Sequence, residues 1–404
     1  PAFINRLVEV ASARYFGTPQ PPALEAKSAD PATQAFAFVT SHRDELERQV
    51  QEWVELSSRT TDPVGLREAL RRVRDDFDGL AMRTVTELTD ERAGWAWGTR
   101  GGVNGGVLFI GHLDVPQSEE SVRPGFRREP ELLFGEGIGS SRGPLVMLLF
   151  ALRALRSMRK LRKLPLGVLL YTDEGRDARY SAGMIRSAAS CASQVFVLRP
   201  GAADDKVITA RRGQRLYRFR VLDNPTRPGR VSKRPEAVLW LCEKLLALGK
   251  MGSRAKRTSV SPVSLKCDRL PMLLPHQLGA DLLVTYPDTA AADAIEARMR
   301  TTLGKRGPRW DLEMISDRPP MRETRKSRAL YESLAKLAKQ WEIPLHRETS
   351  VWPSVAGLVP AKTPCLCGLG PVARDVSTPH EAIQRISIVQ RTLLLAAFLA
   401  NKLE

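Results

Sequence analysis

The stretch GVLFIGHLD, residues 106–114, joins an apolar run to a histidine and an aspartate. A short apolar run that begins at a glycine is typical of a buried β-strand. The polar residues His112 and Asp114 follow at the point where this strand ends. Open α/β sheets bind their ligands at the carboxyl ends of their strands, so the stretch marks His112 and Asp114 as candidate functional residues.

Two further apolar runs, residues 166–171 and 194–198, have the same character. A stretch whose apolar residues have helical spacing, 144–159, lies between the first run and the second. Strands that alternate with helices predict an α/β fold with a mainly parallel sheet and helices on both faces. Polar turns follow these strands too, Thr172-Asp173-Glu174-Gly175 after the second and Arg199-Pro200 after the third.

Residues 215–320 follow a different order of predicted elements: strand, helix, two strands, helix and strand. This βαββαβ order predicts a small α+β domain inserted into the α/β domain. The expected division is therefore an α/β domain at 31–214 and 321–404 with an inserted domain at 215–320. Residues 1–30, which contain the segment Pro19-Gln20-Pro21-Pro22, are predicted to be an N-terminal arm.

Together and in this order, the motifs resemble those of the metallopeptidase family of aminoacylase, acetylornithine deacetylase, succinyl-diaminopimelate desuccinylase and carboxypeptidase G. The resemblance covers nearly the whole chain from about residue 35. It implies a zinc-exopeptidase fold, in which the inserted domain is a lid or dimerisation domain. The matching segments are His112-Leu113-Asp114 (the family's HxD), 135–143 (GRGxxDxKG), 172–175 (a TxEE-type turn), Arg199-Pro200 (EP), 210–213 (ARRG) and 377–381 (HTPEE).

The site of that family holds two zinc ions about 3.5 Å apart, bridged by an aspartate and a water, with a glutamate as general base. Carried over residue by residue, the resemblance makes His112 a zinc ligand, Asp114 its orienting neighbour and Glu174 the general base. The remaining ligand positions hold residues that do not bind zinc as the family does: Ser140, Gly175, Arg199 and Ser377.

Arg199 is the most damaging of these changes. A guanidinium stays protonated, has no lone pair to give a metal and repels one by its charge. We expect it to pair instead with Asp114 or Glu174. The resemblance therefore implies that zinc, the cofactor of the relatives, is not bound here, and that no other cofactor replaces it.

The inserted domain departs from the family as well. Its segment 226–231 reads TRPGRV where the relatives carry SHxGxP, and Val284-Thr285-Tyr286 stands where they carry a substrate-binding arginine. Three arginines are candidates for binding an anion: Arg142, Arg199 and Arg227.

The chain is strongly basic, with Lys+Arg 62 against Asp+Glu 45 and a formal charge of +17. Such an excess predicts attraction to polyanions. Aromatic residues make up only 6% and do not interleave with the basic runs, which favours contact with RNA phosphate or anionic lipid over sequence-specific readout. Five cysteines without a CxxC pair predict an intracellular reducing compartment. Together with the basic charge they favour the mitochondrion over the cytoplasm. No apolar run approaches the roughly 20 residues of a membrane span.

From the altered ligand positions we expect a catalytically inactive metallopeptidase-like protein. Its expected role is that of a scaffold subunit in a larger assembly, such as a ribosome or a respiratory complex, with other subunits as partners and a dimer contact through the lid domain. Two alternatives stay open at this point. One is a non-canonical amide hydrolase or acyl-transfer enzyme that uses Glu174 and His112. The other is a sensor of a small acidic metabolite that binds through Arg199 and Arg142.

Overall fold

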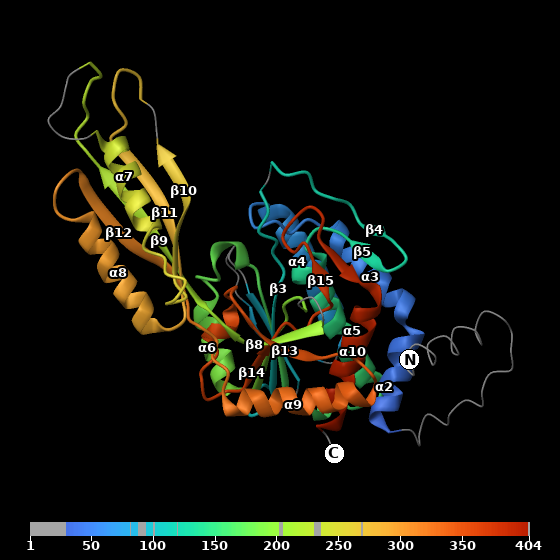
Figure 1. Cartoon of the computed structure of the whole chain (residues 1–404). Coiled ribbons are helices and arrows are strands. Elements are labelled where there is room, and N and C mark those ends of the chain that lie inside the picture. Colours follow the sequence, from blue (N-terminus) through green and yellow to red (C-terminus); the bar gives the residue numbers. More distant parts are fainter. Residues whose placement is uncertain are drawn as a thin grey trace. The chain divides into compact units, whose positions relative to one another are not determined.

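The computed structural model describes residues 30–80, 82–87, 94–99, 102–118, 120–201, 205–229, 236–267 and 270–402 (Figure 1). The expected arm, residues 1–30, lies outside these ranges except for Asp30. The described residues form two compact units. The first contains those up to Thr209, Glu323–Thr349 and those from Val359 onward, and the second contains Ala210–Arg322 and Ser350–Leu358.

The first unit is built on an eight-stranded sheet in the order β1-β2-β6-β3-β7-β14-β8-β13. Its four central strands run parallel, and antiparallel strands adjoin them on both sides. The central strands are β6 (Leu166–Tyr171), β3 (Val107–His112), β7 (Gln194–Val197) and β14 (Cys365–Cys367). The outer strands are β1 (Arg83–Glu87), β2 (Gly94–Gly98), β8 (Lys206–Arg211) and β13 (His346–Ser350). The predicted α/β fold with a mainly parallel sheet is confirmed.

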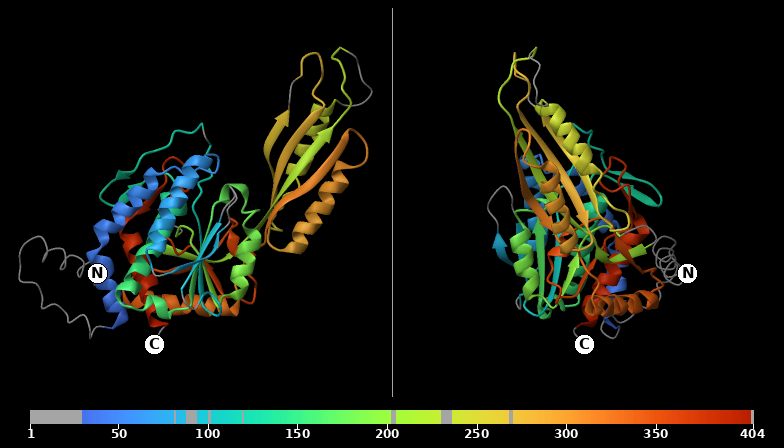
Figure 2. Two further views of the ribbon diagram at one scale, coloured as in Figure 1. Left: turned by 180° about the vertical axis from the view of Figure 1, so that it is seen from behind. Right: turned by 60° about the vertical axis from the view of Figure 1, so that its left-hand side comes forward.

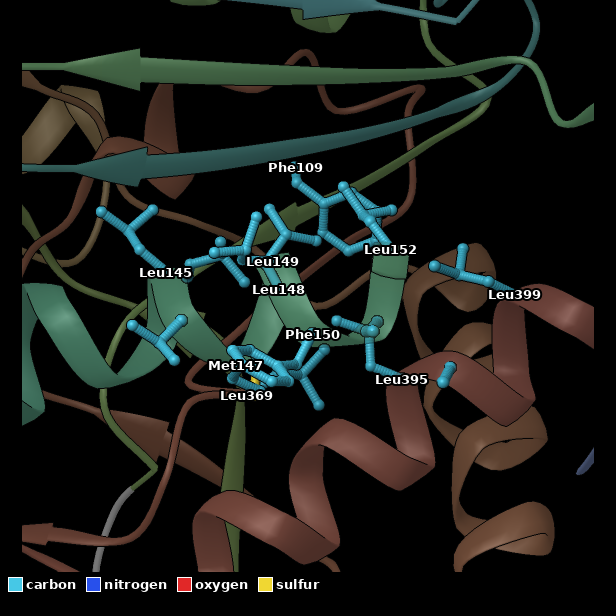
Figure 3. Packing of buried hydrophobic residues seen from close by; sticks show 14 of the residues in the cluster. Phe109, Leu145, Met147, Leu148, Leu149, Phe150, Leu152, Leu369, Leu395 and Leu399 are labelled. Carbon is cyan, nitrogen blue, oxygen red and sulfur yellow. The ribbon is translucent and has the colours of Figure 1, made fainter. Parts of the chain in front are cut away.

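Helix α5 (Gly143–Ser157) forms the core of the first unit. Every residue from Gly143 to Leu152 is buried, and a helix that is apolar all round belongs inside a protein. Figure 3 shows its side chains between Phe109 of β3 and Leu395 and Leu399 of α10 (Arg385–Asn401). The stretch 138–157 is long and apolar enough to cross a membrane by length and composition, but 94% of its most apolar window is buried in the protein. Its apolar surface is thus explained by packing.

The other helices of the first unit flank both faces of the sheet (Figure 2). They are α2 (Pro31–Ser41), α3 (Arg43–Glu55), α4 (Pro63–Asp78), α6 (Ala182–Cys191) and α9 (Arg325–Gln340). A small second sheet consists of β4 (Arg127–Arg128), β5 (Leu132–Phe134), β15 (Ala373–Arg374) and β16 (Ala382–Gln384).

The second unit is a four-stranded antiparallel sheet with two helices. In chain order its elements are β9 (Gly213–Leu222), α7 (Ala237–Gly249), β10 (Ser259–Cys267), β11 (Gln277–Tyr286), α8 (Thr289–Leu303) and β12 (Arg309–Arg318). This is the predicted βαββαβ order. Alternate residues of β9, Tyr217, Phe219 and Val221, are buried in a cluster with Leu241 of α7 and Met299 of α8, as expected for a sheet with one face covered by helices.

Glu323 ties three elements of the first unit together. Its carboxylate accepts hydrogen bonds from Thr209 Oγ1 of β8 at 2.6 Å, Arg328 Nε of α9 at 2.9 Å and Arg347 Nη1 of β13 at 2.9 Å. The Thr209 hydroxyl, and then the two arginines, lower the pKa of Glu323 to about 2. A carboxyl whose pKa is lowered by folding stabilises the protein above its unfolded pKa and loses that contribution as the pH falls through its folded pKa.

The variant Glu323→Gln is therefore expected to lower the free energy of unfolding by about 1–2 kcal/mol at pH 7. The deficit should shrink between about pH 4.5 and pH 2, because the wild-type carboxyl then becomes protonated too. Urea unfolding at pH 7 and pH 3 measures this, with Glu332→Gln on the exposed face of α9 as the control. A deficit of unchanged size at low pH would contradict the assignment.

Candidate functional site

Three strand ends bring the candidate residues to one edge of the sheet. His112 is the last residue of β3, Glu174 begins the turn η3 (Glu174–Arg176) after β6, and Arg199 follows β7. Strand β3 lies between β6 and β7 and runs parallel to both, with His112 opposite Tyr171 and Ile110 opposite Val197. Parallel strands present their carboxyl ends on the same side, so the three side chains meet there.

Asp114 positions the turn that carries Glu174. The Asp114 side chain is fully buried, and its two oxygens accept the backbone N–H groups of Glu174 and Gly175, each at 2.9 Å. A third hydrogen bond comes from the Thr60 hydroxyl at 2.8 Å. Burial raises the pKa of Asp114 to about 6, while these three donors favour its carboxylate form. The resemblance implies that Asp114 orients His112; its carboxylate lies 3.8 Å from His112 Nδ1, and its hydrogen bonds go to the turn of Glu174 and to Thr60.

The tautomer of His112 follows from its partners. Nδ1 lies 2.9 Å from the backbone oxygen of Asp114, and a carbonyl oxygen can only accept, so Nδ1 carries the proton. Burial lowers the pKa of His112 to about 4, which leaves the ring neutral at physiological pH. Nε2 of His112 is therefore a bare acceptor.

Arg199 bridges His112 and Glu174 through a single nitrogen. Its Nη1 lies 3.0 Å from Glu174 Oε1 and 3.2 Å from His112 Nε2. The second oxygen of Glu174 accepts the Tyr171 hydroxyl at 2.7 Å. Burial opposes the charge of Arg199, but the Glu174 carboxylate outweighs it and raises the pKa of the guanidinium. The expected pairing of Arg199 is thus made with Glu174.

The residues present do not fit the two-zinc centre of the resembling family. The Nε2 lone pair of His112 and one oxygen of Glu174 are already acceptors for Arg199. Gly175 offers no side-chain donor, and a Cβ there would lie 2.3 Å from Thr60 Oγ1. Among the described residues, no three His, Cys, Asp or Glu side chains gather as a metal-ligand set. The predicted absence of bound zinc stays a prediction, since it concerns the protein in solution.

The sequence predicts that Arg142 binds an anion, but in the structure its guanidinium hydrogen-bonds mainly to backbone oxygens of the protein. It is 1% exposed. Its guanidinium donates to the backbone oxygens of Trp53, Leu56 and Leu113 and to the Ser58 hydroxyl, the last at 2.6 Å. Burial lowers its pKa to about 10, so it stays charged at neutral pH. Arg227 is exposed in the second unit, in the loop after β9.

Glu381 is a structural residue of the site to which the sequence assigned no role. One carboxylate oxygen accepts the backbone N–H groups of Gly139 and Ser140, at 2.7 and 2.6 Å. The other accepts the N–H of Ser377 at 3.0 Å. Glu381 thus joins the turn at Ser140 to the loop at Ser377, the two altered ligand positions on distant segments. The only sequence feature that indicates this role of Glu381 is its acidic side chain at the end of the segment 377–381.

The family model described as Peptidase family M20/M25/M40 matches residues 108–401. Three solved structures illustrate the similarity. Human carnosine dipeptidase 1 is 14% identical, with a TM-score of 0.66 over 91% of this chain and 99% of that chain. An M20 family metallo-carboxypeptidase from Sulfolobus solfataricus is 13% identical, with a TM-score of 0.70 over 88% and 99%. An amidase of the hydantoinase/carbamoylase family from Burkholderia vietnamiensis is 13% identical, with a TM-score of 0.65 over 90% and 98%. No curated protein matches the chain by sequence.

These comparisons confirm the resemblance to metallopeptidases and correct the functional prediction drawn from it. The predicted catalytically inactive scaffold subunit of a ribosome or respiratory complex is wrong, because the matching family is one of peptidases and the similar structures are peptidases and an amidase. Four zinc-ligand positions of the relatives are occupied here by residues without the expected ligand side chain: Ser140, Gly175, Arg199 and Ser377. They do not by themselves show that hydrolysis is lost.

Proposed function

Since the chain belongs to peptidase family M20/M25/M40, we propose that it hydrolyses the amide bond of a small peptide-like substrate at His112, Glu174 and Arg199. The observation that carries the proposal is the Glu174 carboxylate. It is 7% exposed, pairs with Arg199 and accepts the Tyr171 hydroxyl at the strand-end edge of the sheet. A positioned carboxylate of this kind can take a proton from water.

In the proposed reaction Glu174 is the general base. It removes a proton from a water molecule whose oxygen attacks the amide carbon, and it returns that proton to the departing amine. Arg199 donates from Nη1 to His112 and Glu174, and its side chain is one-fifth exposed. Its cation therefore stabilises the negative charge that develops on the amide oxygen, as preorganised donors do in other acyl-transfer sites.

The remaining residues position these two groups. Asp114 holds the backbone of Glu174. The Tyr171 hydroxyl donates to one oxygen of the Glu174 carboxylate, and Arg199 donates to the other. His112 accepts from Arg199 and limits the movement of the guanidinium. No step is assigned to a metal ion because the donors do not fit one.

The chain's substrate class can be tested with three families of compounds: dipeptides, N-acyl amino acids and N-carbamoyl amino acids. Release of the free amine is followed with the purified full chain, with and without a chelator. We expect turnover of at least one class, with the rate unchanged by the chelator. A rate no higher than that of the buffer for all three classes would overturn the proposed function.

The other predictions about the cell biology of the chain are untested by the structure. They are the contacts with RNA phosphate or anionic lipid, the partner subunits, the dimer through the inserted domain, and the reducing compartment. All of them stay predictions.

A further inference from the structure

Arg199 places one nitrogen between His112, which stands at a metal-ligand position of the relatives, and Glu174, which stands at their general-base position. Its Nη1 donates to Glu174 Oε1 at 3.0 Å and to His112 Nε2 at 3.2 Å. Because Nδ1 of His112 donates to the backbone oxygen of Asp114, Nε2 is the unprotonated nitrogen of the ring, and its lone pair accepts from Arg199. A metal ion and Arg199 would compete for that same lone pair.

The neighbouring residues enclose the guanidinium and leave little room for other ligands. The Glu174 side chain is 7% exposed and the Arg199 side chain 20%. At Gly175, the next position along the chain, a Cβ would lie 2.3 Å from Thr60 Oγ1 and 3.1 Å from Pro116 Cβ. The ligand that the relatives carry at this position could not enter without moving Thr60.

The charge of Arg199 also opposes the binding of a metal ion at this site. Within this cluster Glu174 and Arg199 form an ion pair, and the His112 ring is neutral. A divalent cation entering beside Arg199 would face its positive charge at close range in a poorly screened site. It would also have to break both hydrogen bonds of Nη1.

We infer that Arg199 is the resident cation of this site, where its guanidinium takes the place of a metal ion by joining His112 to Glu174 and thereby keeps zinc out. The inference uses the location of the proposed active site, but it concerns occupancy and not turnover. A failure to find a substrate would leave it standing.

Calorimetric titration of the full chain with zinc chloride tests the inference. The wild-type chain is expected to bind no zinc in the micromolar range. In Arg199→Glu the guanidinium is gone and a carboxylate joins His112 and Glu174, which gives three protein ligands of the kinds that catalytic zinc sites use. That variant should bind one zinc at least about a hundredfold more tightly than the wild type, and zinc should raise its melting temperature. The double variant His112→Ala/Arg199→Glu should lose this gain.

Two controls separate the cation from other effects. Arg199→Lys keeps the positive charge and should exclude zinc as the wild type does. Arg179→Glu makes the same charge change at an exposed arginine of the first unit and should not create a site. If Arg199→Glu fails to fold, the zinc titration of the wild-type chain is the test of the inference. Wild-type chain that binds zinc as tightly as relatives with a complete ligand set would overturn the inference.

Discussion

Glu174→Gln is expected to lower kcat/KM by about a thousandfold on any substrate that the chain hydrolyses, within the range that removal of a general base produces. The glutamine amide keeps the size of the carboxylate and can still accept the Tyr171 hydroxyl, but it cannot take a proton from water. Steady-state rates of amine release measure the effect. Far-ultraviolet circular dichroism and the melting temperature check that the variant is folded.

The matched control for this prediction is Glu131→Gln, which makes the same chemical change at an exposed residue between β4 and β5. It should leave kcat/KM within about twofold of the wild type, as expected for a surface residue without contacts to the site. If Glu174→Gln retained wild-type activity, Glu174 would not be the base and the hydrolase would have to use another group.

Arg142→Met is expected to destabilise the protein by about 3–5 kcal/mol, the usual cost of removing one partner from a buried charged network. The guanidinium holds the segment around Leu56 and Ser58 to Leu113 at the end of β3. A methionine side chain fills part of the volume but offers no donor to the oxygens of Trp53 and Leu56 or to the Ser58 hydroxyl, whereas the Leu113 oxygen keeps the hydroxyls of Ser58 and Ser141. The free energy of unfolding from urea denaturation of the first unit measures the loss.

For comparison, Arg179→Met removes an exposed arginine and should change the free energy of unfolding by no more than about 0.5 kcal/mol. A loss below about 1 kcal/mol in Arg142→Met would mean that the backbone oxygens find water or other donors when the arginine is gone.

Much of the fold could be predicted because it depends on periodicity within single segments. The apolar runs at 106–110, 166–171 and 194–198 coincide with β3, β6 and β7 in the structure. The βαββαβ order of 215–320 is also a property of local pattern and appears in the second unit. The convergence of His112, Glu174 and Arg199 followed from the rule that parallel strands end on one side.

The partners of buried polar groups could not be predicted in the same way. Arg142 follows a glycine-rich turn, and nothing in its neighbours along the chain shows that it reaches the backbone of Trp53 and Leu56. Tyr171 ends an apolar run and is indistinguishable in sequence from a core tyrosine, although its hydroxyl holds Glu174. Contacts of this kind join segments that are far apart in sequence, so they depend on the tertiary fold.

The functional prediction failed at one identifiable step. A guanidinium at position 199 has no lone pair for zinc, but the conclusion that catalysis is lost assumes that the relatives' metal is the only source of positive charge. The structure shows a guanidinium in contact with the candidate base itself. A cation is therefore present at the site, and the loss of ligands does not imply the loss of chemistry.

The most direct test of this account is the rate of amine release by protein that contains no metal, with the metal content verified by mass spectrometry on the same sample. The account predicts that the metal-free chain hydrolyses at least one of the three substrate classes, that added zinc does not raise the rate, and that Glu174→Gln abolishes it. Activity that appears only when zinc is restored would contradict the role of Arg199. No activity above that of Glu174→Gln in either state would contradict the proposed hydrolase.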